Sequence, residues 1–181
     1  MASLVKKVGN KKYYQIDTYR AAGIIFYFIK NKNIYILINK ENRNNKVVYN
    51  SIGGKVDKYD KTIFETMTRE FNEETGFLVS DKLNKIKFER NKCIELIKSK
   101  YLLLLYEIKF DNIWDLLPYT YSKIFENVEP FNHRESLSLE WVNLFEFKEK
   151  NTNFLLKMLL SKVKNNKRIR KFNSNYQIPF L

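Results

Sequence analysis

One stretch decides the fold of this chain: Gly53-Gly-Lys-Val-Asp-Lys-Tyr-Asp-Lys-Thr-Ile-Phe-Glu-Thr-Met-Thr-Arg-Glu-Phe-Asn-Glu-Glu-Thr-Gly-Phe77. Its second half carries bulky apolar side chains at the spacing of one helix face: Ile63, Phe64, Met67 and Phe71. Thr62 and Glu65 have the form of a capping box, whose side chains accept hydrogen bonds from backbone N–H groups that the helix leaves unpaired. Gly76 stands where helices commonly end. The sequence therefore predicts a helix over 62–75 that follows a glycine-containing loop.

Three carboxylates share one face of that helix. Glu70, Glu73 and Glu74 stand at positions i, i+3 and i+4, so their side chains project from the same side. Their mutual repulsion is comparable to the interactions that hold a helix together, and a cation among them would relieve it. Oxygen ligands favour hard ions, so we expect Mg²⁺ or Mn²⁺ rather than zinc. Arg69 precedes Glu73 by one helical turn and is placed to pair with it and to orient the cluster.

These residues resemble the Nudix box, Gly-x5-Glu-x7-Arg-Glu-U-x-Glu-Glu-x-Gly-U, in which U is a bulky aliphatic residue. The run from Arg69 to Phe77 fills the second half, with phenylalanine at the aliphatic positions, and Gly54 fits the opening glycine. The first half departs from the pattern. Asp60 has the required spacing from Gly54 but replaces glutamate, and the segment between Asp60 and Arg69 is one residue longer than the pattern. We expect the loop before Thr62 to absorb the extra residue.

The resemblance implies an activity and a set of site residues. Nudix enzymes hydrolyse a nucleoside diphosphate linked to another group, X, by attack of water at phosphorus. By this resemblance, Glu70, Glu73 and Glu74 hold divalent Mg²⁺ or Mn²⁺ ions and the carbonyl of Gly54 supplies a further ligand. The general base is Glu74 or Glu70, and Glu135, in a loop before a later strand, is a second candidate. The alternative for Glu135 is an ordinary surface acid beside an arginine.

The remaining patterns fit the same α/β fold. Apolar and β-branched runs predict strands over 21–29, 34–39, 47–52, 85–90, 93–98, 101–110 and 137–142. Aromatic residues predict a helical insert over 112–127, and an amphipathic pattern predicts a last helix over 145–163. Strands, a helix, more strands and a final helix indicate an α/β/α sandwich around a mixed β-sheet, the Nudix fold.

Three parts of the chain are expected to differ in role. The resemblance covers residues 20–162, which we expect to form the hydrolase domain with the helical insert inside it. Residues 1–20 are polar and basic and are predicted to form an arm or an edge strand. Residues 163–181 are predicted to form a basic tail.

The charge of the chain suggests a polyanionic partner. The formal net charge is +13 and the sequence pI is about 9.6. An AT-rich genome would also enrich lysine, but dispersed codon bias would not concentrate it. Between residues 162 and 171 the chain holds six cations and no acid: Lys162, Lys164, Lys167, Arg168, Arg170 and Lys171. Such a run can hold an RNA backbone through its phosphates without reading sequence.

The substrate expectation is the 5′ cap of messenger RNA. The run Arg-Glu-Phe-Asn-Glu-Glu-Thr-Gly is similar to that of the decapping Nudix enzymes of large DNA viruses, which release 7-methyl-GDP. In the helical insert, Trp114 and Tyr121 are candidates to stack on a cationic base. The alternative for both rings is packing in a core, because aromatic residues at near-helical spacing usually face one.

Other functions remain open at this point. One alternative is a small-molecule Nudix pyrophosphatase acting on nucleoside triphosphates, dinucleoside polyphosphates, ADP-ribose or diphosphoinositol phosphates. Another is a non-catalytic RNA-binding module with the Nudix fold. The expected partner is a nucleotide or capped RNA, with no stable protein partner and no membrane, since no apolar run is long enough to span a bilayer. The start of the chain lacks the apolar core of a secretory signal, and we expect an intracellular, cytoplasmic location, in the host cytoplasm if the protein is viral.

Overall fold

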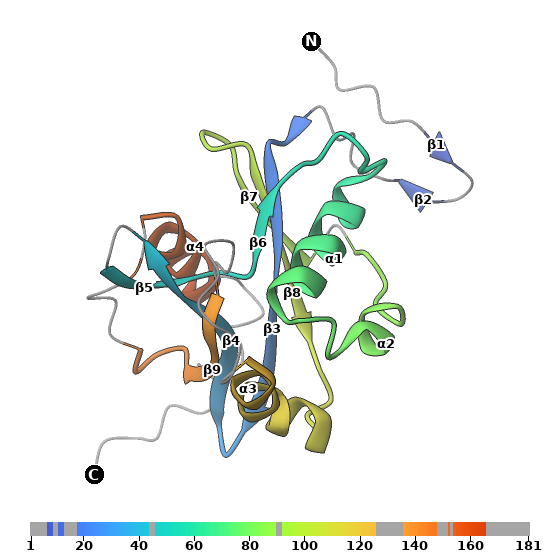
Figure 1. The fold of residues 1–181 in the computed structure, drawn as a ribbon. Coiled ribbons are helices and arrows are strands. Elements are labelled where there is room, and N and C mark those ends of the chain that lie inside the picture. The colour runs from blue at the N-terminus through green and yellow to red at the C-terminus, as the bar shows by residue number, and fades with distance from the viewer. Residues whose placement is uncertain are drawn as a thin grey trace. The chain divides into compact units, whose positions relative to one another are not determined.

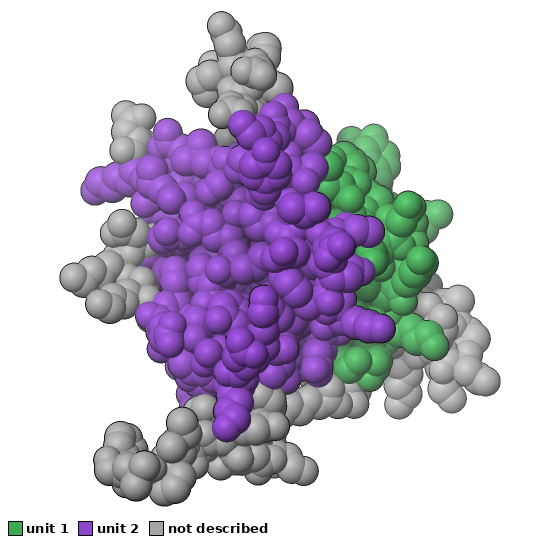
Figure 2. Space-filling view, turned by 90° about the horizontal axis from the view of Figure 1, so that it is seen from below, with its two compact units in different colours: residues 1–25, 51–106 green, residues 26–50, 107–181 purple. Residues whose placement is uncertain are grey.

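The chain has two compact units, coloured separately in Figure 2. Unit 1 comprises residues 1–25 and 51–106, and unit 2 comprises residues 26–50 and 107–181. The structure, a computed structural model, describes residues 7–8, 11–12, 18–43, 46–89, 92–125, 136–147, 152 and 154–165.

Figure 1 shows the strands and helices of the described residues in their order along the chain. The elements are β1 (Lys7–Val8), β2 (Lys11–Lys12), β3 (Ala21–Lys30), β4 (Asn33–Arg43), β5 (Lys46–Asn50), β6 (Gly53–Lys55), α1 (Ile63–Glu74), α2 (Ser80–Leu83), β7 (Cys93–Leu96), β8 (Tyr101–Glu107), α3 (Asn112–Phe125), β9 (Ser136–Asn143) and α4 (Phe154–Lys164). Seven strands form one sheet in the order β5-β4-β3-β8-β7, where β6 also pairs with β3 and β9 with β4. In the predicted N-terminal arm, β1 and β2 pair with each other as a separate antiparallel ribbon.

Unit 1 is built around the first half of β3. β6 runs antiparallel to it, with Ala21 opposite Lys55 and Gly23 opposite Gly53. β7 and β8 form an antiparallel pair in the same unit. The sequence predicts one strand that ends at the paired glycines, but the structure has two strands there, because the chain leaves β5 after Asn50 and pairs again as β6. This second pairing places the glycines opposite β3.

Helix α1 follows the prediction closely. Thr62 accepts a hydrogen bond from the backbone N–H of Glu65 at 3.1 Å. The Glu65 carboxylate accepts from the N–H of Lys61 at 2.7 Å, one residue before the position that a capping box uses. The apolar face is buried as expected, at Ile63, Met67 and Phe71. That face fixes the rotation of the helix, so the carboxylates of its last turns stand on the other side.

Unit 2 begins with a tight hairpin. β3 and β4 pair up to Lys30 opposite Asn33, and the two turn residues between them, Asn31 and Lys32, have φ values of 50° and 65°. Positive φ at both positions is the geometry of a two-residue hairpin, which the polar Lys30–Asn33 run predicts. β4 then carries β5 at one end and β9 along much of its length, both antiparallel.

Helix α3 packs against β9 in unit 2. Asp111 caps the helix by accepting from the N–H groups of Ile113 and Trp114 at 3.1 and 3.2 Å. The indole Nε1 of Trp141, in β9, donates to the carbonyl of Trp114 at 2.9 Å. The insert is therefore helical over 112–125, as predicted for 112–127, and its aromatic residues meet those of β9.

A buried polar cluster also lies in unit 2. Asn50 donates from Nδ2 to Glu41 Oε1 at 2.6 Å, and Asn39 donates to Ser136 Oγ at 2.7 Å. All four side chains are at most 5% exposed. The hydrogen bonds join β4 to β5 and to the start of β9, which helps fix their register.

Two predicted elements differ in the structure. Residues 85–89 form no strand, because the N–H groups of Lys85 and Ile86 donate to the carbonyls of Lys82 and Leu83 in a turn rather than to a strand. The ring of Phe88 lies 5.5 Å from that of Phe64 on α1. The last helix begins at Phe154 rather than at 145. Residues 144–147 instead make a single turn, in which Asn143 accepts from two later N–H groups through its side chain and its carbonyl. Within the described ranges, no helix is long and apolar enough to cross a membrane.

Candidate active site

Two glycines and one helix build the candidate site, all within unit 1. Gly53 has a φ of +147°, and a Cβ there would lie 2.5 Å from the carbonyl oxygen of Ala22, so the position requires glycine. A Cβ on Gly54 would collide with the carboxylate of Glu70. The strand therefore brings its bare backbone against a carboxylate of α1.

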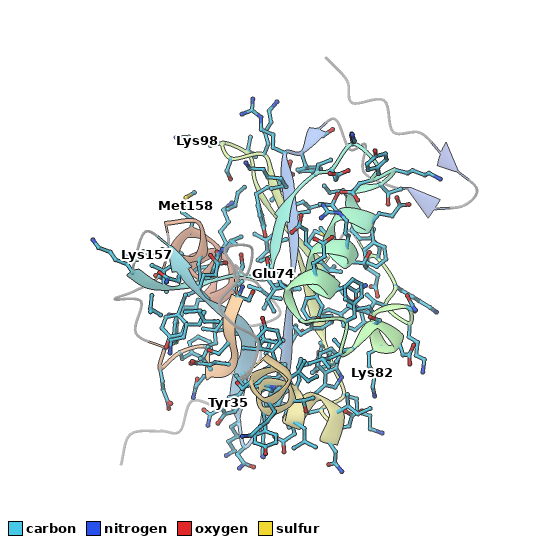
Figure 3. All side chains as sticks on the ribbon, viewed as in Figure 1. Tyr35, Glu74, Lys82, Lys98, Lys157 and Met158 are labelled. Atoms are coloured by element: carbon cyan, nitrogen blue, oxygen red, sulfur yellow. The ribbon has the colours of Figure 1, made fainter. Side chains whose placement is uncertain are left out.

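The three predicted carboxylates stand on the last turns of α1. Glu74, labelled in Figure 3, accepts from the backbone N–H of Gly53 through Oε1 at 3.2 Å. Of the two glutamates that pair with Arg69, Glu70 is the more enclosed. Its side chain is 16% exposed, whereas that of Glu73 is 51% exposed. The structure thus brings Gly54, Glu70, Glu73 and Glu74 together in one unit.

Arg69 contacts two of these carboxylates and the neighbouring strand. Its Nη1 lies 2.8 Å from Glu70 Oε1 and 3.0 Å from Glu73 Oε2. Its Nη2 donates to the carbonyl of Lys55 at 2.8 Å. One guanidinium therefore ties β6 to two of the carboxylates, which neutralises part of their repulsion and holds them in place.

Asp60 also supports Arg69. The sequence did not predict this contact, because Asp60 replaces glutamate and is one residue further from Arg69 than in the Nudix pattern. Its Oδ1 and Oδ2 accept from Arg69 Nε and Nη2 at 3.1 and 3.0 Å, a bidentate pair. Oδ2 also accepts from Thr66 Oγ1 at 2.8 Å and from the N–H of Asp57 at 2.9 Å. The extra residue is accommodated in the loop, where Asp57 accepts from the N–H of Tyr59 and turns the chain. Asp60 thus reaches the arginine despite its shorter side chain and the longer spacing.

The pKa of Asp60 reflects this support. Burial alone would raise it, but the hydrogen bonds from Arg69, from the backbone of Asp57 and from Thr66 bring it below its ordinary value. The pKa of Arg69 is raised, chiefly by its hydrogen bond to Asp60. Both groups are therefore charged at neutral pH, and their pairing is a fixed part of the site.

The donor set fits a hard divalent cation. Glu70, Glu73 and Glu74 supply oxygen atoms only, and the space that a Cβ of Gly54 would fill lies against one of these carboxylates. Among the described residues, no three acidic, histidine or cysteine side chains converge on a common metal position as they stand. Glu70 and Glu73 are both paired with the Arg69 guanidinium.

Sequence reasoning missed Tyr101, which belongs to the same unit. It is the first residue of β8 and is 3% exposed. Burial raises the pKa of its hydroxyl, the carboxylates of Glu74 and Glu70 raise it further, and the hydroxyl of Ser51 works in the opposite direction. In the sequence, Tyr101 opens an apolar strand run and carries no signal of a polar role.

The predicted substrate residues lie elsewhere or outside the description. Trp114 and Tyr121 are in α3 of unit 2, where they are 3% and 2% exposed, and Tyr121 donates to the carbonyl of Ser136 at 3.1 Å. Their burial supports the packing alternative. Lys162 and Lys164 lie in the last turn of α4. Glu135, Lys167, Arg168, Arg170 and Lys171 lie outside the described residues.

Solved structures resemble this chain in fold. The NUDIX domain of Shewanella oneidensis NrtR, complexed with ADP ribose, matches with a TM-score of 0.51 and 10% identity over 80% of this chain and 85% of that one. C. elegans Ap4A hydrolase, in a binary complex, matches with a TM-score of 0.48 and 17% identity over 80% and 94%. A NUDIX hydrolase from Nitrosomonas europaea matches with a TM-score of 0.40 and 14% identity over 78% and 86%.

The sequence itself matches no family profile and no curated protein. The likeness to the NrtR domain is one of fold, and a fold alone does not assign a reaction. This chain has the Nudix fold, an α/β architecture with a seven-stranded mixed sheet.

Proposed function

We propose that the chain is a divalent-metal-dependent hydrolase that cleaves a diphosphate linkage in a nucleoside diphosphate–X substrate. The main support is the arrangement of the acids on α1: Glu74 and Glu70 lie against the bare backbone of Gly53 and Gly54, and Arg69 pairs with Glu70 and with the neighbouring Glu73. Acids gathered beside a glycine pair repel one another and lower the stability of the fold, so stability alone does not account for them. Hydrolysis of a polyanionic diphosphate accounts for them, because the acids can hold the cations that neutralise its charge.

The residues of unit 1 would have separate roles in the proposed reaction. Glu70, Glu73 and Glu74 would hold Mg²⁺ or Mn²⁺ together with the carbonyl of Gly54. When bound, the divalent ion neutralises the diphosphate and makes water a better nucleophile at neutral pH. Glu74 or Glu70 would take the proton of the attacking water at a carboxylate oxygen. Arg69 orients the carboxylates and does not need to touch the substrate.

We propose that the substrate is the 5′ cap of messenger RNA, in which the RNA is the X group and 7-methyl-GDP is released. The concentration of positive charge between residues 162 and 171 supports a long anionic substrate, because a run of cations binds successive phosphates. In this proposal, residues 20–162 are the hydrolase domain, residues 163–181 are an RNA-binding tail, and residues 1–20 are an arm with a basic ribbon. Glu135 stays a second candidate for the base.

A small nucleotide substrate is the second candidate function. The NrtR domain that shares this fold was solved with ADP ribose, itself a nucleoside diphosphate linked to a sugar. The burial of Trp114 and Tyr121 also favours this candidate, since it leaves the cap proposal without exposed stacking rings at these two positions.

A substrate panel tests the proposal. The purified chain is incubated with Mg²⁺ or Mn²⁺ and capped RNA, free cap analogue, nucleoside triphosphates, dinucleoside polyphosphates, ADP-ribose or diphosphoinositol phosphates. The expected result is release of 7-methyl-GDP from capped RNA, lost on chelation and in Glu74→Gln. Glu65→Gln is the matched control, because Glu65 lies on the same helix but outside the cluster. Turnover of ADP-ribose alone would select the second candidate, and binding of RNA without any turnover would select a non-catalytic module.

A truncation separates the tail from the domain. Ending the chain after Asn165 keeps α4 and its buried Val163 but removes four cations. Capped RNA should bind more weakly, and the slope of log affinity against log salt should shrink by roughly 0.7 per lost phosphate contact. Hydrolysis of free cap analogue should stay unchanged, because so short a ligand has too few phosphates to reach the cations of the tail. Equal losses on both substrates would instead assign the tail to packing.

A further inference from the structure

The hydroxyl of Tyr101 is an unusual feature of the acidic site. The side chain is 3% exposed, and its Oη makes no hydrogen bond of good geometry among the described residues, although the Ser51 hydroxyl is near enough to lower its pKa. Leaving a buried hydroxyl unpaired costs stability, so such groups usually have a reason to be kept. The position of this atom supplies the reason.

Two glycines make room for the hydroxyl. Gly23 of β3 and Gly53 of β6 lie opposite each other. A Cβ on Gly53 would stand 2.6 Å from Tyr101 Oη, and a Cβ on Gly23 would collide with the same atom. Any other residue at either position would push the hydroxyl away. The paired strands therefore hold a polar atom directly against the backbone of Gly53.

That backbone is also in contact with the acidic cluster. The N–H of Gly53 donates to Glu74 Oε1 at 3.2 Å, so the carboxylate and the hydroxyl approach the same residue. The carboxylates of Glu74 and Glu70 act on the Tyr101 hydroxyl electrostatically, with Glu74 the stronger of the two. A tyrosine hydroxyl is protonated at neutral pH, since its ordinary pKa is about 10, and can donate one hydrogen bond.

We propose that Tyr101 is a positioning residue that donates a hydrogen bond from Oη to the Glu74 carboxylate when the cluster holds a divalent cation. Together with the N–H of Gly53, it would give Glu74 two donors and fix which oxygen atom faces the ion. Groups that orient a ligand in this way contribute to metal affinity without touching the metal. The inference rests on the proposed function, because it assumes that Glu74 is a metal ligand.

The test replaces Tyr101 with phenylalanine, which removes only the oxygen atom. Mn²⁺ affinity is measured by isothermal titration calorimetry and by the electron paramagnetic resonance of free Mn²⁺, without substrate. In Tyr101→Phe the dissociation constant should rise about tenfold. The melting temperature of the metal-free protein should not fall, since the lost hydroxyl makes no hydrogen bond of good geometry among the described residues.

Tyr19→Phe is the matched control. Tyr19 is buried in the same unit, and its hydroxyl donates at 3.1 Å to Oε1 of Glu95, which is not one of the cluster's carboxylates. This variant should lose thermal stability and keep its Mn²⁺ affinity. A second measurement uses Glu74→Gln, in which Tyr101→Phe should weaken Mn²⁺ binding no further.

Each contrary result is distinct. An unchanged Mn²⁺ affinity in Tyr101→Phe, or a loss of affinity matched by a lower melting temperature, would overturn the positioning role. An equal further loss of affinity in the Glu74→Gln background would overturn the assignment to Glu74. If the unmodified chain bound no Mn²⁺, both the role and the proposed function would fall. If it bound Mn²⁺ but hydrolysed no diphosphate, only the proposed function would fall, and the affinities would still decide on Tyr101.

Discussion

Helices α1 and α3 are both amphipathic, but their exposed sides carry different kinds of residue. Each buries one apolar side in its own unit, through Met67 and Phe71 on α1 and through Trp114 and Tyr121 on α3. Their other sides differ. α1 presents acids that are tied to an arginine, whereas α3 exposes large apolar side chains: Ile113, Leu116, Tyr119 and Ile124.

The difference lies in what each helix supports. On α1, the charged side is organised by contacts from outside the helix, from Asp60, from the carbonyl of Lys55 and from the N–H of Gly53. On α3, the polar contacts serve the helix and its strand, as the cap by Asp111 and the bond from Trp141 do. We therefore expect changes on α1 to act on chemistry and changes on α3 to act on stability.

The largest expected effect is on the acids of α1. Glu73→Gln and Glu74→Gln each remove one charge while keeping the shape of the side chain. Each should lower turnover by orders of magnitude and leave the melting temperature within a few degrees of the unmodified value. Steady-state kinetics and thermal melts of the same preparations measure both. Near-normal turnover in both variants would rule out a metal-dependent mechanism on this helix.

The counterpart on α3 is Trp114→Ala. The ring lies 4.9 Å from that of Phe26 and is buried, so its removal leaves a cavity. Urea titration should show a loss of about 3–5 kcal/mol in the free energy of unfolding. Tyr119→Ala, on the exposed side of the same helix, should cost far less. If Trp114→Ala kept its stability and lost substrate affinity by roughly 1–3 kcal/mol, the ring would be a stacking surface after all.

A glycine test sharpens the account of α1. In Gly54→Ala the new Cβ collides with the Glu70 carboxylate, so either the side chain or the strand must move. Turnover and Mn²⁺ affinity should fall by roughly 10- to 100-fold, as for the loss of a metal-orienting contact. Lys55→Ala is the control, because that side chain is exposed and only its backbone carbonyl reaches Arg69. If turnover and Mn²⁺ affinity were the same in Gly54→Ala and Lys55→Ala, the close approach of Gly54 to Glu70 would not matter for the site.

The smallest effect concerns Asp60 and depends on pH. Its folded pKa lies below the ordinary value, so the charged form stabilises the fold above the unfolded pKa of about 3.9, and this stability is lost as pH falls through the folded pKa. Asp60→Asn should therefore melt lower than the unmodified chain at pH 7. The difference should disappear on acidification to below the folded pKa. Thermal melts across pH 2.5 to 7 measure it, and a pH-independent difference would mean that the Asp60 charge is not the cause.

Several features were predictable because they depend on neighbours in the chain. The 62–75 helix, its buried face and the Lys30–Asn33 hairpin follow from spacing and turn chemistry that extend over a few residues. The grouping of Glu70, Glu73 and Glu74 follows from helical geometry alone. Residues 85–89 were mispredicted as a strand because an alternating pattern does not say whether a partner strand is available.

The 62–75 helix and its acidic face follow from the sequence alone, as does their position after a glycine pair. The contact between Asp60 and Arg69 and the burial of Trp114 depend on the folded chain. So does the position of the Tyr101 hydroxyl at Gly53, although 48 positions separate the two in the numbering. The physical reason is that backbone conformation responds to local pattern, whereas a side chain's burial, hydrogen-bond partners and pKa depend on atoms that the folded chain brings from far away.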